Sequence, residues 1–199
     1  MMNRRVPSAH IYRRRRIAAL VLLAVAACAV VLAFGMLGTQ PSTALQGDQL
    51  GPDGAESAAE YRERAEESLA QADEPTYALV GFNDALTPEE TADLLSPVQR
   101  MNAIVIGLAA PVVVPEPSAG TDRSDVIDTV LHRVADRARD IGEEAPTTVD
   151  AAVVYSSGAE LRALAADPRV ATVEAAPADA PWGSFGVRPP SNVHQSEKP

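Results

Sequence analysis

An uninterrupted apolar segment near the N-terminus constrains this chain more than any other feature. Residues 17–37 read IAALVLLAVAACAVVLAFGML, and none of these 21 residues is charged or a proline. As a helix the segment would be about 30 Å long, the thickness of the hydrocarbon core of a bilayer. Helices of globular proteins are rarely apolar on every face over this length. The sequence therefore predicts a transmembrane helix over residues 17–38.

Basic residues directly before this segment predict its orientation. Four consecutive arginines precede it, namely Arg13, Arg14, Arg15 and Arg16, whereas residues 38–56 contain no base. Bases that flank a membrane helix stay on the cytoplasmic side. We therefore expect these arginines to determine the topology, with residues 1–16 as a basic cytoplasmic arm. The expected location is the plasma membrane, crossed once, with the lipid bilayer as a partner and the C-terminal part outside the cytoplasm.

Two other interpretations of the apolar segment stay open. A cleaved signal peptide would have a shorter apolar core, although Ser42-Thr43-Ala44 resembles a small-residue cleavage site. The stretch Val25-Ala26-Ala27-Cys28 resembles the lipobox of a lipoprotein, but the residues that follow Cys28 remain apolar as far as Leu37. An uncleaved anchor accounts for the full length of the segment.

The charge of the remaining chain excludes one class of function. Six of the 17 lysine and arginine residues precede Ile17 and no acid does, so the rest carries 11 bases against 27 acids, a net charge of −16. A body this acidic repels phosphate backbones, which argues against nucleic acid as a partner. The lone cysteine, Cys28, provides neither a disulfide framework nor a thiolate metal site.

Composition divides the part after the apolar segment into three regions. Residues 39–74 have the composition of an acidic linker or stalk, with a helix expected over 55–72. That helix is expected to be solvated, with a self-associating helix as the alternative. Residues 75–175 contain the apolar patterns of an α/β domain, and we expect 76–175 to fold without its flanks. Residues 176–199 are rich in proline and predict a disordered tail.

The order of elements in the domain predicts its fold class. Strands are expected at 76–82, 102–109, 147–157 and 170–174, and helices after Thr87, over 124–141 and after Ser157. Two strand-helix-strand units predict an α+β, ferredoxin-like split βαβ sandwich with one four-stranded antiparallel sheet and the 124–141 helix inserted. The alternative is a small mixed α/β sheet in which that helix is a regular crossover.

The long helix over 124–141 has one apolar stripe and one charged stripe. We expect an apolar stripe against the sheet, formed by Val126, Val130, Val134 and Ile141. Asp128, His132 and Asp136 lie four residues apart on another face. This second stripe is expected to be solvated; the alternative is a weak divalent-metal site or a pH-sensitive patch.

Two stretches resemble a known family. Residues 76–95, which include YALVGFNDALTPEETADLL, and residues 149–183, which include VVYSSGAELRALAADPRVATVEAAPADAPWG, resemble the I9 inhibitor domains that precede subtilisin-like proteases. The resemblance implies a ferredoxin-like fold, a role as folding chaperone, and inhibition by a C-terminal tail laid in the protease cleft. The expected membrane anchor and the 111–147 segment depart from that family.

No catalytic, cofactor-binding or metal-binding residues are expected. His132 is the only one of three histidines in a predicted folded element, and Ser156-Ser157-Gly158 lacks the first glycine of a nucleophile elbow. Trp182 and Phe185 in the tail predict a partner contact. We expect a membrane-anchored, extracytoplasmic interaction or regulatory module without enzymatic activity, whose partner is an envelope protein or a protease. The alternatives are an I9-like inhibitor or chaperone of a subtilisin-like protease, and an enzyme whose site the sequence does not reveal.

Overall fold

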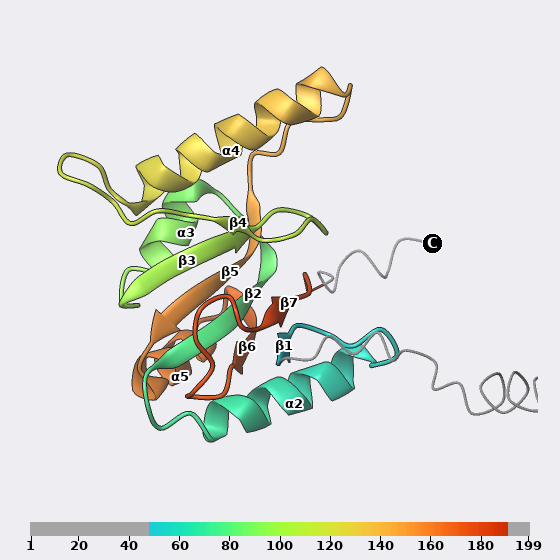
Figure 1. The fold of residues 1–199 in the computed structure, drawn as a ribbon, viewed down its shortest axis with the longest axis vertical. Helices are drawn as coiled ribbons and strands as arrows, with labels where there is room; N and C mark the ends of the chain where they lie inside the picture. The colour runs from blue at the N-terminus through green and yellow to red at the C-terminus, as the bar shows by residue number, and fades with distance from the viewer. Residues whose placement is uncertain (1–47, 191–199) are drawn as a thin grey trace, which may run out of the picture. The chain divides into compact units, whose positions relative to one another are not determined.

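The computed structural model describes residues 48–190, which form four helices and seven strands (Figure 1). In chain order these are β1 (Gln49–Leu50), α2 (Ala58–Ala70), β2 (Thr76–Leu86), α3 (Pro88–Leu94), β3 (Arg100–Val105), β4 (Val112–Val113), α4 (Arg123–Asp140), β5 (Val149–Ser156), α5 (Gly158–Ala165), β6 (Val170–Ala175) and β7 (Gly186–Val187). Each of the four helices begins with a capping box, in which the cap side chain and an acid three residues later bond reciprocally to the backbone. The cap of α4 is Asp122, two residues before the predicted start of that helix at residue 124.

Five strands form the central sheet in the order β4-β3-β5-β2-β6. All neighbouring strands are antiparallel, and the register places Tyr77 opposite Tyr155 and Leu79 opposite both Val153 and Glu174. The short strands β1 and β7 form a separate parallel pair.

Both faces of the sheet are covered. One face packs against α3, α4 and α5 and includes Val80 and Val154, whereas the other packs against β1 and the segment after β6 and includes Leu79 and Val153. Figure 1 shows the C-terminal segment, in red, crossing in front of the sheet with α5 behind it. Coverage on both sides explains why β5 is apolar along most of its length instead of alternating.

The predicted fold class, a ferredoxin-like split βαβ sandwich preceded by a transmembrane helix, is corrected by this structure. The fold is mixed α/β with four helices, a five-stranded sheet and further elements on both flanks. Within residues 48–190, no helix is both long enough and apolar enough to span a bilayer, so the predicted membrane-spanning helix is not among the helices of this structure. The segment 17–38 that carried this prediction lies outside the described residues, as do residues 1–16 with Arg13, Arg14, Arg15 and Arg16.

The linker helix is part of the domain instead of a solvated stalk. Helix α2 lies along edge strand β6, where the Ser68 hydroxyl accepts a hydrogen bond from the Ala175 N–H at 3.0 Å. Its stripe of Tyr61, Ala65 and Leu69 is buried. Edge strands expose unpaired backbone groups, and a helix laid along one covers them.

The C-terminal end of α2 also meets the start of α5. The Arg162 guanidinium donates to the carbonyl oxygens of Leu69 and Ala72 at 3.3 and 3.0 Å, and Gly158 packs directly against the Ala72 carbonyl. The flanks of the expected 76–175 domain therefore supply part of its core, which differs from the expectation that this region folds without them.

Candidate functional site

Four of the six aromatic side chains in residues 48–190 gather on one face of the sheet. We call Tyr77, Tyr155, Trp182 and Phe185 the aromatic platform. Tyr77 is central: its ring centroid lies 4.9 Å from Tyr155, 5.5 Å from Trp182 and 5.6 Å from Phe185. The Trp182 and Phe185 rings meet edge to face at 5.9 Å. Tilted and edge-to-face pairs at these distances are favourable arrangements for aromatic rings.

Hydrogen bonds of the chain after β6 place the two tail rings over the sheet. The Ala176 N–H donates to the Tyr77 carbonyl at 2.8 Å, and the Thr76 hydroxyl donates to the Ala176 carbonyl at 2.9 Å. Two turns follow, closed by the Ala180 N–H to the Pro177 carbonyl and by the Ser184 N–H to the Pro181 carbonyl, each at 3.0 Å. The tail through residue 190 is thus ordered, in contrast to the predicted disorder.

The platform has a buried base and an exposed rim. Phe185 is 8% exposed and packs with Leu50 and Leu79, so it anchors the tail. Trp182 is 39% exposed, and Tyr77 and Tyr155 are half-buried. The exposed Arg100 pairs with Tyr155 in the register of β3 and β5, and its guanidinium lies 3.5 Å from Glu116. Exposed tryptophan, tyrosine and arginine side chains are the types enriched in protein interfaces.

A buried carboxylate fastens the N-terminal flank beside the platform. Glu174, 3% exposed, accepts a hydrogen bond from the Gly51 N–H at 2.6 Å and another from Arg64. Burial raises the pKa of Glu174, while the Gly51 N–H and Arg64 oppose that rise. The carbonyl of Gly51 accepts from Arg64 at 3.0 Å, and the Leu50 carbonyl accepts from the Arg188 N–H at 2.8 Å. The first and last described segments are therefore tied to α2 and β6.

The ion pair between Glu56 and Arg64 predicts acid sensitivity of this flank. Both Glu56 carboxylate oxygens accept from Arg64 at 2.9 Å, and this hydrogen bonding lowers the pKa of Glu56 from 4.5 to about 2. A lowered pKa stabilises the folded state above pH 4.5, and that stability is lost as the pH falls towards 2. We expect the stability difference between the wild type and Glu56→Gln to shrink from pH 5 to pH 2.5, measured by urea unfolding. A difference that stays constant over this range would contradict the assignment.

The charged stripe of α4 forms no metal site in the described part of the chain. The His132 Nδ1 lies 3.1 Å from the Asp128 carboxylate, with the His132 side chain 71% exposed, whereas Asp136 pairs with Arg139 at 2.7 Å. Among residues 48–190, no group of three or more metal-ligating side chains comes together. The groove beside His132, of about 400 Å³, is open and is also lined by Arg139 and Glu89.

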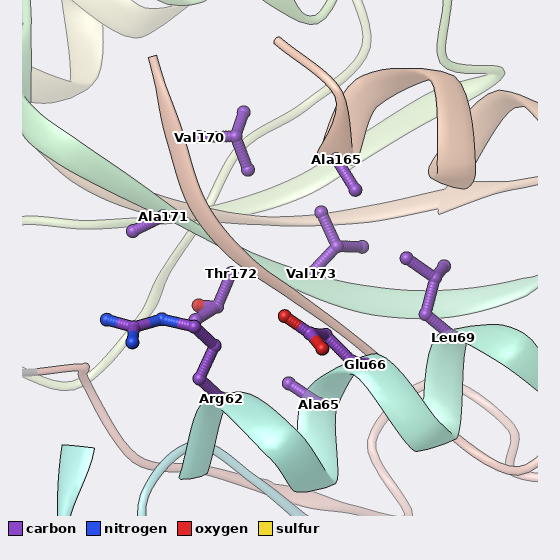
Figure 2. Close-up of a pocket in the computed structure, with 9 residues that line it drawn as sticks. All are labelled: Arg62, Ala65, Glu66, Leu69, Ala165, Val170, Ala171, Thr172 and Val173. Carbon is purple, nitrogen blue, oxygen red and sulfur yellow. The ribbon is translucent and has the colours of Figure 1, made fainter. Parts of the chain in front are cut away.

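A smaller cavity lies between α2, α5 and β6, with a volume of about 80 Å³. Figure 2 shows Arg62, Glu66 and Leu69 rising from α2 towards the strand that carries Thr172 and Val173. The volume accommodates a few water molecules at most and is too small for a cofactor.

The structure brings the two tail residues predicted from sequence, Trp182 and Phe185, into one site. It adds two residues that the sequence interpretation missed as site residues, Tyr77 and Tyr155. The sequence signal for these two residues is one tyrosine in each of two strands. Once the strand register is known, both tyrosines lie on the same face of the sheet. No protein-family model, characterised protein or solved structure matches the chain.

Proposed function

We propose that this protein is a non-enzymatic protein-interaction or regulatory module, and that the aromatic platform is its contact surface. The carrying observation is that Trp182, the only tryptophan of the chain, is held 39% exposed against Tyr77 by an ordered tail. A large rigid ring on a fixed base binds a partner with little loss of side-chain entropy.

The electrostatics support a protein partner and argue against nucleic acid. The described residues contain 10 of the 17 bases and 26 of the 27 acids, a net charge of −16. Such a surface repels phosphate groups. An envelope protein or a protease remains the expected partner, and the extracytoplasmic location expected from the N-terminal arginines stays a prediction.

The inhibitor alternative has less support from this geometry. An inhibitor of the I9 type would lay its C-terminal tail in a protease cleft. Here residues 176–190 pack on their own sheet through Ala180 and Phe185, and β7 pairs with β1. Such a tail would first have to leave a buried position, at the cost of the apolar contacts of Phe185.

Partner capture from the platform tests the proposal. A photoreactive side chain at position 155 should crosslink one defined protein, whereas the same group at exposed position 141, on the end of α4, should not. With that protein purified, we expect Trp182→Ala to weaken binding about 30-fold, the effect of a 2 kcal/mol hot spot. Calorimetric titration measures the affinity, and circular dichroism checks that the variant is folded.

The matched control is Ile141→Ser, which removes another exposed apolar side chain, at the C-terminal end of α4 and outside the platform. It should bind like the wild type. Equal affinities of wild type and Trp182→Ala for the captured protein would refute the proposed function.

A further inference from the structure

We infer that the segment of the partner that meets the aromatic platform is basic, with an arginine or lysine seated beside Trp182. This inference rests on the proposed function and specifies the chemistry of the partner. Three observations carry it: a groove that adjoins the platform, the unpaired acids around that groove, and the exposed ring faces.

The groove lies between the C-terminal end of α2 and the segment that follows β6. It has a volume of about 290 Å³ and is lined by Gln71, Glu74, Thr76 and the stretch 175–178, among others. The hydrogen bond from the Ala176 N–H to the Tyr77 carbonyl joins a groove-lining residue to the centre of the platform. The groove and the centre of the platform are therefore built on adjacent residues of β2, Thr76 and Tyr77.

The charge around the groove favours a cation. Asp73, Glu74 and Asp179 are exposed acids in the segments that form or flank it, and none of them has an ion pair within residues 48–190. Arg162 of α5 lies beside this end of α2, and its guanidinium is engaged with the carbonyls of Leu69 and Ala72.

The rings supply the second half of the recognition. A cation over the face of tryptophan or tyrosine is attracted by the ring quadrupole, and arginine also stacks on such faces. Arg100, the base at the opposite rim, is already paired with Glu116 at 3.5 Å, so the Trp182 end is the more negative end of the platform. The occupant that satisfies both the acids and the rings is a basic protein segment.

Binding of matched peptides to the full chain tests this inference, with Trp182 fluorescence as the reporter. The probes are an eight-residue Gly/Ser peptide with four arginines and the same peptide with four glutamates. We expect the arginine peptide to change the emission saturably and to bind at least about tenfold more tightly than the glutamate peptide. Its affinity should fall as salt concentration rises.

Two variants and one control variant distinguish binding at a specific site from nonspecific attraction to the acidic protein surface. Glu74→Gln should weaken the arginine peptide about threefold, and Trp182→Ala about threefold or more by calorimetry. Glu143→Gln, which neutralises an exposed acid after α4, should leave the affinity unchanged.

Equal binding of the two peptides, or equal effects of Glu74→Gln and Glu143→Gln, would overturn the inference. A captured partner that depends on Trp182 but lacks a basic contact segment would overturn it too, and would leave the proposed function standing. Loss of Trp182 dependence for the captured partner would instead refute the proposed function.

Discussion

Replacing Val130 with aspartate is expected to unfold the domain. Val130 is 1% exposed on the face of α4 that packs into the main core, next to Ile127 and Leu131. Its neighbours in that core are apolar side chains, which offer a buried carboxylate neither a hydrogen bond nor a counter-charge. An unpaired buried charge costs several kcal/mol, which is comparable with the total stability of a domain of this size. Thermal melting followed by circular dichroism should show a lost or strongly lowered transition.

His132→Ala is the matched control on the same helix. The His132 side chain is 71% exposed, and its contact with Asp128 is a solvated pair within one helix. We expect a change in stability of no more than about 0.5 kcal/mol, as for most exposed positions. If His132→Ala proved the more damaging variant, the charged stripe of α4 would be a site and its assignment as a solvated face would be wrong.

Gly158→Ala is expected to destabilise the domain strongly, although it adds only a single methyl group. A Cβ at this position would lie 1.7 Å from the carbonyl oxygen of Ala72, a backbone atom that no rotamer change can move. The start of α5 would have to separate from the end of α2, and the bonds from Arg162 to Leu69 and Ala72 would be strained or lost. We expect a loss of at least about 3 kcal/mol, measured by urea unfolding.

Gly54→Ala provides the control for the added methyl group itself. The nearest atom to a Cβ at position 54 is Nη1 of Arg188 at 3.9 Å, an ordinary van der Waals distance. Its effect should stay within about 0.5 kcal/mol. Similar losses in the two variants would show that the contact between α2 and α5 is not tight in solution.

The contact partners of the apolar stripes were harder to predict than the stripes themselves. Tyr61, Ala65 and Leu69 recur at the spacing of one helix face in the sequence, and the structure buries all three. Its burial depends on Glu174 and Ala175, more than 100 residues away in sequence, through Arg64 and Ser68. Local composition carries no trace of such a partner, and the segment therefore looked like a stalk.

The ends of elements show the same limit. The strand predicted at 76–82 continues as β2 to Leu86. The Asn83 side-chain amide donates to the Pro168 carbonyl at 2.8 Å, and the register shifts between Gly81 and Leu86. In α4 the buried positions include Ile127, Val130 and Leu131, while Ile141 follows the helix and is exposed. The period of a helix predicts buried positions accurately in the middle of the helix and poorly at its end.

The sequence by itself determined the local elements: the helix starts after Thr87 and Ser157, the apolar face of α4, and Trp182 and Phe185 as candidate contact residues. These follow from short-range hydrogen bonding and from the period of a helix or a strand, which are properties of neighbouring residues. Only the tertiary structure decided that both flanks join the domain, that β4 pairs with β3 at the edge of the sheet, and that Tyr77 and Tyr155 complete the platform. Those features depend on strand register and on contacts between side chains that are far apart in the sequence. The free energy of burying such a side chain is set by the residue it contacts and not by its local sequence.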